Sequence, residues 1–200
     1  RVAGYMIGKR GVEIHGVYFE SPPYTGEQAR EKVVSLAQTL ANYTGRMYLN
    51  TVSVTEIQET LMQKCDEKLF TLLLRRFMMR LAERTARLTG SAALVTGESV
   101  GQVASQTMSA LGVTDEAVSL PVFRPCIGLD KEEIIVRARQ IGTFDISSLP
   151  YEDCCTVFTP RHPNTRPTLE EILENESRAD VNPLAARAFE TRRTLRLEGK

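Results

Sequence analysis

Residues 92–102 read AALVTGESVGQ, and this stretch decides the fold. Its first five residues form a compact apolar run, which is typical of a short buried strand. Gly97 follows the run and lets the backbone come close to a ligand. Ser99 and Gln102 have the spacing of a capping box, which predicts a helix over residues 100–111.

A strand, a glycine turn and a helix in this order admit two interpretations. In an open parallel sheet, ligands bind beyond the carboxyl ends of the strands. The first N–H groups of the following helix are then free to hold an anion. The same pattern also occurs as an ordinary turn that binds nothing, and the local sequence favours neither interpretation.

Strand and helix signals alternate on both sides of this stretch. Thr55 and Gln58 fit a capping box for one of the intervening helices. In the long helix over 69–88, three arginines recur every four residues on a face separate from the apolar rows. The alternation predicts an α/β fold with a doubly wound parallel sheet. Strands are expected over residues 12–19, 47–54, 92–96 and 118–124, and further helices over 2–9, 26–43 and 131–140.

The character of the chain changes after Thr143, where several prolines punctuate a loop. Thr168 and Glu171 then have the capping-box spacing that opens a short charged helix. Pro183 suits the first position of a last helix. Residues 161–200 are too polar to form a core of their own, so we expect a C-terminal helical arm that wraps around the sheet or joins another part of the protein.

Composition excludes several classes of protein. Hydrophobic residues make up 42% and charged residues 25% of the 200, and the 25 basic residues balance the 25 acidic ones. These values are typical of a globular domain and predict no strong non-specific attraction to nucleic acid. No apolar run approaches a membrane span and no signal peptide is visible, so we expect a soluble, cytoplasmic protein without a membrane partner.

The adjacent cysteines Cys154 and Cys155 lie in the proline-bounded loop. Such cysteines are candidates for a nucleophile, a persulfide carrier or a metal ligand, and a buried structural pair fits equally well. Reactivity needs a lowered thiol pKa, which the neighbouring Glu152 and Asp153 would oppose. A zinc site that adds Cys126 is not expected, because adjacent ligands on one metal strain the backbone.

Two aromatic residues, Tyr18 and Phe19, lie near the carboxyl end of the first expected strand. An aromatic ring at this edge of a parallel sheet can stack on a base. Packing into the core is an equally good interpretation of Phe19. The residues alone therefore indicate a ligand edge without identifying its ligand.

Five segments together resemble the ATP-pyrophosphatase domain of the tRNA 4-thiouridine synthetase (ThiI) family. The resemblance covers residues 1–160, and the strings TGESVGQVASQT and DCCTVFTP are its most specific parts. It implies a Rossmann-like domain of the adenine nucleotide alpha hydrolase type over residues 1–160. The segments are VAGYMIGKRGVEIHGVYFESPPYT, LLRRFMMRLAER, VTGESVGQVASQT, RPCIGLDKEEII and YEDCCTVFTP.

The resemblance also implies a function. The family uses ATP and Mg²⁺ to adenylate the uridine at position eight of tRNA and then replaces its oxygen with sulfur. The sulfur arrives as a persulfide from a cysteine desulfurase. The same proteins can supply sulfur for the thiazole of thiamine, which makes a ThiS-type sulfur carrier protein a further expected partner.

Matching the motifs residue by residue assigns roles to individual side chains. Tyr18 and Phe19 lie where the family holds the adenine. Cys154 matches the sulfur-carrying cysteine and is expected to be accessible, although Cys155 is one residue away and could be the true match. Three further positions match nucleotide contacts, namely Arg75, Gly97 and Gln106.

The sequence departs from the family pattern at its amino end. The family's phosphate loop, S-G-G-x-D-S, lies immediately before the position of Val2, and the helix over 2–9 has no start of its own. We therefore expect the given chain to lack this loop and the amino-terminal RNA-binding modules. Two other interpretations stay open, namely an iron–sulfur tRNA thiolase with a cluster on Cys126, Cys154 and Cys155, and a non-catalytic nucleotide-binding fragment.

Overall fold

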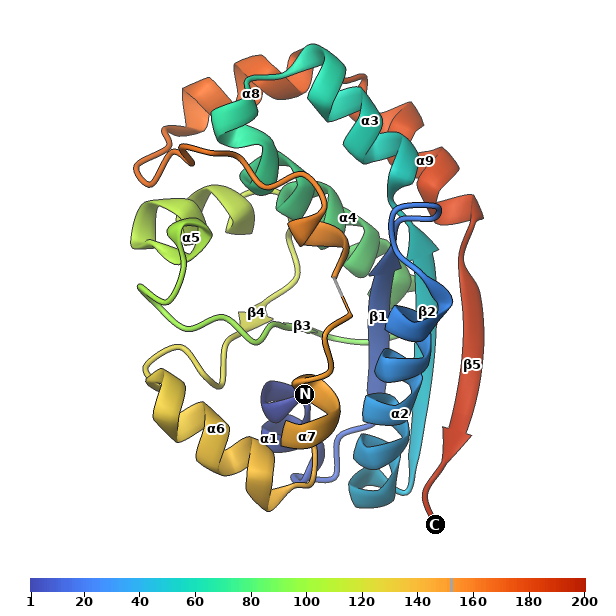
Figure 1. Ribbon diagram of the computed structural model, residues 1–200. Helices are drawn as coiled ribbons and strands as arrows, with labels where there is room; N and C mark the ends of the chain where they lie inside the picture. The colour runs from blue at the N-terminus through green and yellow to red at the C-terminus, as the bar shows by residue number, and fades with distance from the viewer. Residues whose placement is uncertain (152) are drawn as a thin grey trace.

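The computed structural model describes residues 1–151 and 153–200, and the side chain of Cys155 lies outside this description. It has the expected α/β character (Figure 1). The strands are β1 (Ile14–Glu20), β2 (Arg46–Ser53), β3 (Leu94–Val95), β4 (Val122–Phe123) and β5 (Arg193–Glu198). The helices are α1 (Val2–Gly8), α2 (Glu27–Thr44), α3 (Thr55–Lys64), α4 (Phe70–Thr89), α5 (Met108–Asp115), α6 (Lys131–Gln140), α7 (Phe144–Ser147), α8 (Leu169–Ser177) and α9 (Val181–Glu190), with single 3₁₀ turns at Glu67–Leu69, Ala104–Gln106 and Cys154–Thr156.

The strands form two sheets. β1 pairs in parallel with β2, from Ile14 opposite Met47 to Glu20 opposite Ser53. β5 adds to the other edge of β2 in the antiparallel direction. β3 and β4 form a second, parallel pair. The expected parallel, Rossmann-like fold is therefore confirmed, and β5 is an antiparallel addition to it.

Helices cover both faces of the larger sheet. Since successive residues of a strand point to opposite sides, β1 packs against both helix layers. Tyr18 packs with α2 in one apolar cluster. Its neighbours Val17 and Phe19 pack against the main cluster on the other face, which α4 dominates. Figure 1 shows α2 and α4 on the two sides of β1 and β2. This is the doubly wound arrangement expected from the sequence.

Helix α4 forms the centre of the main core. Leu73, Phe77 and Leu81, which recur every four residues along the helix, are each 0% exposed. Burying a side chain of this kind stabilises the fold by about 1.5–3 kcal/mol. The helix ends at Gly90, whose φ of 71° is the left-handed conformation that glycine adopts without strain.

The predicted helix over residues 100–111 is wrong in its first half. Gly101 has a φ of 78°, which interrupts helical geometry, and α5 begins only at Met108. Thr107 caps α5 by accepting a hydrogen bond from the backbone N–H of Ala110 at 3.2 Å. Ser99 is not a cap, because its hydroxyl donates to the carbonyl oxygen of Leu129 at 2.5 Å.

The capping box predicted at Thr55 and Gln58 is also wrong, although α3 does begin at Thr55. The Gln58 side chain is 0% exposed and turns inward. It bonds to residues far along the chain instead of to the helix end. By contrast, the capping box of Thr168 and Glu171 is present with both of its hydrogen bonds.

The last forty residues contain more than the helical arm expected for residues 161–200. After α8 and α9 the chain forms β5, so the tail completes the larger sheet. α9 begins at Val181, which places Pro183 third in the helix and still within the first turn, where proline is tolerated. No helix within the described residues is long and apolar enough to cross a membrane.

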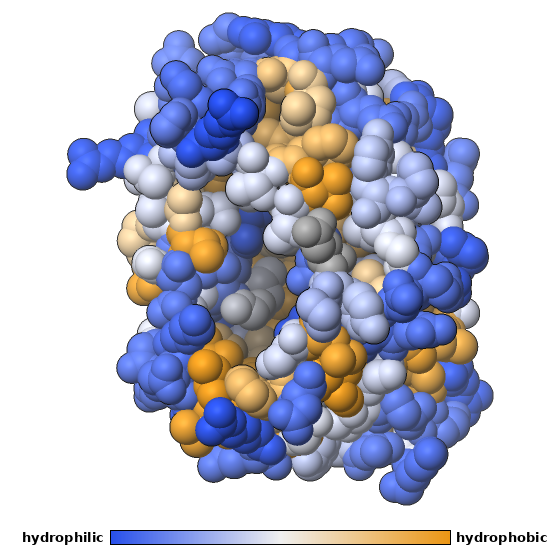
Figure 2. Space-filling model, in the orientation of Figure 1, coloured by the Kyte–Doolittle hydropathy of each residue, from blue (hydrophilic) through white to orange (hydrophobic). Residues whose placement is uncertain are grey.

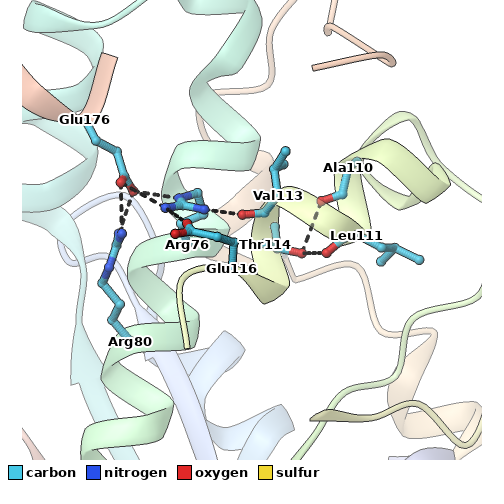
Figure 3. A network of polar contacts seen from close by, with 8 residues as sticks. All are labelled: Arg76, Arg80, Ala110, Leu111, Val113, Thr114, Glu116 and Glu176. Atoms are coloured by element: carbon cyan, nitrogen blue, oxygen red, sulfur yellow. Dashed lines mark hydrogen bonds and ion pairs between the residues drawn. The ribbon is translucent and has the colours of Figure 1, made fainter. Parts of the chain in front are cut away.

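A buried polar network attaches this tail to the core (Figure 3). Arg76 of α4 donates from Nε to Oε1 of Glu176 in α8 at 2.8 Å. Its Nη2 donates to Oε2 of Glu116 at 2.8 Å, and its Nη1 to the carbonyl oxygen of Val113. Arg80 binds both carboxylate oxygens of Glu176. The network therefore joins α4, α5 and α8.

Candidate functional site

A cavity of about 1320 Å³ lies between the two sheets. Its wall includes residues of β1, β3, α1 and α4, together with the segment that follows β3. In Figure 2 the face in view is hollowed near its middle, with hydrophobic residues around the hollow. The wall includes the carboxyl end of β3 and the residues that follow it, Thr96 and Gly97, and this edge is where an open α/β sheet binds its ligands.

The five residues predicted to contact a nucleotide all line this cavity, although they come from four separate segments. They are Tyr18, Phe19, Arg75, Gly97 and Gln106. The structure therefore brings these five residues to one cavity, while the role of each residue stays a prediction.

Tyr18 and Phe19 do not present their rings in the same direction. Tyr18 belongs to the apolar cluster on the α2 side, and Phe19 packs against the cluster on the α4 side. The two rings therefore cannot stack together on one base. Both residues contribute the backbone of β1 at the edge of the cavity, and this backbone can contact a base directly.

Gly97 faces open space. A Cβ atom added there would meet no protein atom within 4 Å beyond its chain neighbours. Protein packing therefore does not require glycine at this position. Gln106 folds back to the same segment, because its Oε1 accepts a hydrogen bond from the backbone N–H of Ser99 at 3.3 Å.

Arg75 is held by a buried glutamate that the sequence analysis did not single out. Its Nη2 is paired with Oε1 of Glu98, whose side chain is only 5% exposed. Oε2 of Glu98 accepts hydrogen bonds from Nε of Arg124 at 2.6 Å and from the hydroxyl of Thr96 at 2.8 Å. Glu98 thus fixes Arg75 at the cavity wall, where a guanidinium can bind a phosphate.

One cysteine of the proline-bounded loop lies in the core. Cys154 is 5% exposed and belongs to the main apolar cluster, so the expectation of an accessible thiol is wrong for this structure. Phe158, a few residues later, packs edge-on against Phe70 and Tyr24 with ring centroids 5.8 and 5.0 Å apart. These apolar contacts hold Phe158 against Phe70 of α4. The prolines and polar residues of the segment did not predict this packing.

Tyr18 shares a cavity with the segment that follows the cysteines. Burial raises the pKa of its phenol to about 12, and the negative charges of a Cys154 thiolate, Glu20 and Asp153 contribute in the same direction. Thr156 and Thr159, which follow the cysteines, line the same cavity as Tyr18. The nucleotide edge and the cysteine loop are therefore neighbours, and the Tyr18 phenol keeps its proton at neutral pH.

The described residues do not offer a metal site. Within residues 1–151 and 153–200 no group of three or more His, Cys, Asp or Glu side chains could hold a metal ion. Cys126 packs with α1 and α6, whereas Cys154 packs in the main cluster. This separation gives no support to a cluster that would use both of these cysteines.

Comparison with known proteins identifies relatives of the whole chain. The family model described as "Thiamine biosynthesis protein (ThiI)" matches residues 1–181. A probable tRNA sulfurtransferase of Caldanaerobacter subterraneus subsp. tengcongensis is 55% identical over 179 residues, which are 90% of this chain and 47% of that protein. One of Acetivibrio thermocellus is 55% identical over 194 residues, with 97% and 50% covered.

A solved structure is similar over almost the full chain. It is the crystal structure of a 4-thiouridine synthetase–RNA complex with bound ATP, with a TM-score of 0.94 and 39% sequence identity. The match covers 98% of this chain and 52% of the other. The chain thus spans about half the length of the curated relatives and of the solved structure that it matches.

Proposed function

The chain belongs to the ThiI family, and on that premise we propose that it forms the ATP-binding and sulfur-transferring region of a tRNA sulfurtransferase that makes 4-thiouridine at position eight. One observation carries the proposal: five residues from four segments, each matching a nucleotide contact of the family, line a single cavity together with Thr156 and Thr159 of the cysteine loop. The similar solved structure holds both RNA and ATP.

The cavity residues suit an adenine nucleotide. The edge of β1 at Tyr18 and Phe19 offers backbone groups and an aromatic surface to the adenine. Arg75 supplies a fixed guanidinium for a phosphate, and Gly97 leaves room for the ligand to approach the backbone. The family's phosphate loop, which the resemblance places before Val2, would enter here, because Ala3 and Gly4 also line the cavity.

Two chemical steps follow from the proposal. Uridine O4 is a poor leaving group. When O4 attacks the α-phosphorus of ATP, pyrophosphate leaves and the adenylated oxygen can later depart as part of AMP, which is a good leaving group. The terminal sulfur of a persulfide then attacks C4 as AMP leaves, which joins C4 to the carrier cysteine through an S–S bond. A second thiol would attack the sulfur of that cysteine, break the S–S bond and release 4-thiouridine, leaving a disulfide. Arg75 would stabilise negative charge on the transferring phosphoryl group.

The partners and cofactors of the proposal come from the family. Cys154 or Cys155 would carry the persulfide delivered by a cysteine desulfurase in the cytoplasm. A role in thiamine thiazole formation would add a ThiS-type carrier. Mg²⁺ would enter with ATP; since the described residues show no carboxylate site for it, we derive no step through the metal.

Reconstitution tests the proposal directly. The full-length protein is incubated with ATP, unmodified tRNA, a cysteine desulfurase and cysteine, and the digested tRNA is analysed by mass spectrometry. We expect 4-thiouridine at position eight that depends on ATP and on the desulfurase. Absence of the thiolated nucleoside from a folded, ATP-binding protein contradicts the proposed function.

Gly97→Val tests the placement of the nucleotide. We expect the variant to fold normally, because the added side chain meets no protein atom within 4 Å of its Cβ, and to lose ATP binding because valine occupies the ligand's space. Isothermal titration of the full-length protein measures the loss. Gly112→Val, at an exposed and equally open glycine of α5 away from the cavity, is the matched control. Unchanged affinity in Gly97→Val would remove the nucleotide from this turn.

Arg75→Ala tests the phosphate contact. Glu98 keeps Arg124 and Thr96 as partners, so the variant should stay folded. Loss of one hydrogen bond to a charged group costs roughly 1.5–3 kcal/mol, which corresponds to roughly ten- to more than a hundredfold weaker ATP binding. The control is Arg87→Ala, an exposed arginine of the same helix. Equal affinities in the two variants would make Arg75 a structural residue.

A further inference from the structure

We propose that Gln58 is a positioning residue for sulfur transfer, which holds the backbone of the cysteine loop against the carboxyl end of β1. This inference rests on the proposed function and adds a residue to it that no motif assigns. It is carried by a chain of three buried groups that joins the loop to the strand.

The two ends of the Gln58 amide bind two different parts of the site. Its Nε2 donates to the carbonyl oxygen of Cys154 at 2.7 Å. Its Oε1 accepts a hydrogen bond from the hydroxyl of Ser21, the residue directly after β1. Both Gln58 and Ser21 are 0% exposed, so no water competes for these bonds.

The orientation of this amide is fixed by chemistry. A carbonyl oxygen can only accept a hydrogen bond, so the NH₂ group of Gln58 must face Cys154. The carbonyl group bound in this way belongs to the peptide bond between Cys154 and Cys155. The anchor therefore acts on the loop whichever of the two cysteines carries the sulfur.

A second buried side chain anchors the same loop further upstream. Lys32 of α2 is 6% exposed, and its Nζ donates to the carbonyl oxygens of Leu149 and Tyr151 at 3.1 and 3.2 Å. Burial of an ammonium group is costly unless it is hydrogen-bonded, and an apolar residue would fill the space without that cost. The carbonyl groups of Leu149, Tyr151 and Cys154 are thus each bound by a buried polar side chain.

The position of the loop matters for the second chemical step and not for the first. An attacking atom must lie about 3–3.5 Å from its target, and a misplacement of about 1 Å can lower a rate about a hundredfold. The described lining of the nucleotide cavity includes neither Gln58 nor Ser21. Loss of the anchor should therefore slow attack on C4 while adenylation proceeds.

The test compares these two steps in the full-length protein. Gln58→Met preserves side-chain length and removes both hydrogen bonds. In a single turnover with ATP, tRNA and a persulfide-loaded enzyme, pyrophosphate release reports adenylation and 4-thiouridine reports sulfur transfer. We expect at least about a tenfold slower formation of 4-thiouridine, with pyrophosphate release within about twofold of the parent.

The matched control is Gln63→Met, an exposed glutamine on the same helix, which should leave both rates unchanged. A purely structural role for Gln58 would lower both rates together with the folded fraction, and that result overturns the inference. Thiolation within about twofold of the parent also overturns it, since such a change is too small for a positioning role. A parent protein that makes no 4-thiouridine would overturn the proposed function itself.

Ser21→Ala provides a second variant if Gln58→Met does not fold. It deletes one oxygen atom and leaves the bond between Gln58 and Cys154 in place. We expect the same separation of the two rates with a smaller loss, about threefold in 4-thiouridine formation. Equal rates of both steps in Ser21→Ala and the parent would show that the chain of bonds does not position the loop.

Discussion

Changing Cys154 to serine in the full-length protein is expected to eliminate 4-thiouridine formation while ATP and tRNA binding stay nearly intact. Serine preserves the size of the side chain at a site that is only 5% exposed, so the core around it should survive. It cannot hold a sulfane sulfur, so the attacking group is lost. Thiolation of tRNA and binding of ATP are measured on the same preparations.

The remaining cysteines serve as controls for this prediction. Burial raises the pKa of the Cys65 and Cys126 thiols. A protonated thiol is a poor nucleophile, so Cys65→Ser and Cys126→Ser should be active. If Cys155→Ser loses activity and Cys154→Ser keeps it, the sulfur carrier is the second cysteine. Thiolation of tRNA by a variant that carries both Cys154→Ser and Cys155→Ser would contradict the persulfide mechanism.

Elements whose signal is local were predicted well from the sequence. Helices α2 and α4 carry long apolar periodicities, and their observed bounds lie within two residues of the expected ones. Strands β1 and β2 were likewise placed within two residues at either end. Their alternation with helices was enough to identify the parallel, doubly wound fold, because it follows from chain order alone.

Elements that depend on distant partners were not predicted. β5 forms because its residues pair with β2, from Arg46 opposite Glu198 to Thr51 opposite Arg193. The six residues of β5 carry no local signal for pairing with residues that lie more than 140 positions earlier in the chain. The helix expected from Val100 failed for a local reason, because Gly101 adopts a left-handed conformation with a φ of 78°, which glycine takes without strain and which interrupts helical geometry.

The candidate site likewise contains residues that the sequence indicated and residues that only the fold revealed. Motif matching selected five residues that line one cavity, and their contact with a ligand stays a prediction. It did not select Glu98 or Gln58, which act on Arg75 and on the cysteine loop through buried contacts. A glutamine with capping-box spacing is indistinguishable in sequence from one that bonds 96 residues away. Only the fold reveals which bond it makes.

Arg76→Met is expected to be among the most destabilising single changes in this chain, in contrast to Arg75→Ala next to it. The Arg76 side chain is 0% exposed and forms the centre of the network that joins α4, α5 and α8 (Figure 3). Its removal leaves the carbonyl oxygen of Val113 and the Glu116 carboxylate without this donor. Breaking a buried ion pair on one side costs about 3–5 kcal/mol, a large part of a typical stability of about 5–15 kcal/mol.

Urea denaturation measures this loss, with Arg87→Met as the control. Arg87 is exposed and pairs with Glu83 one helical turn away on α4, an arrangement worth about 0.3–0.5 kcal/mol. Both variants exchange an arginine for methionine on the same helix, so propensity cancels in the comparison. If Arg76→Met unfolds within about 1 kcal/mol of Arg87→Met, the network does not attach the tail to the core.

The network also predicts how the loss depends on pH. Burial raises the pKa of Glu176, but hydrogen bonds from Arg80 and Arg76 outweigh this effect and hold the folded-state pKa below the ordinary glutamate value of 4.5. A carboxyl group with a lowered folded-state pKa stabilises the protein fully above its unfolded pKa. That contribution disappears as the pH falls through the lower, folded-state value. The parent and Arg76→Met should therefore differ most in unfolding free energy near neutral pH and converge in acid below pH 4.5, and a difference that stays constant down to full protonation would show that the cost comes from packing and not from charge.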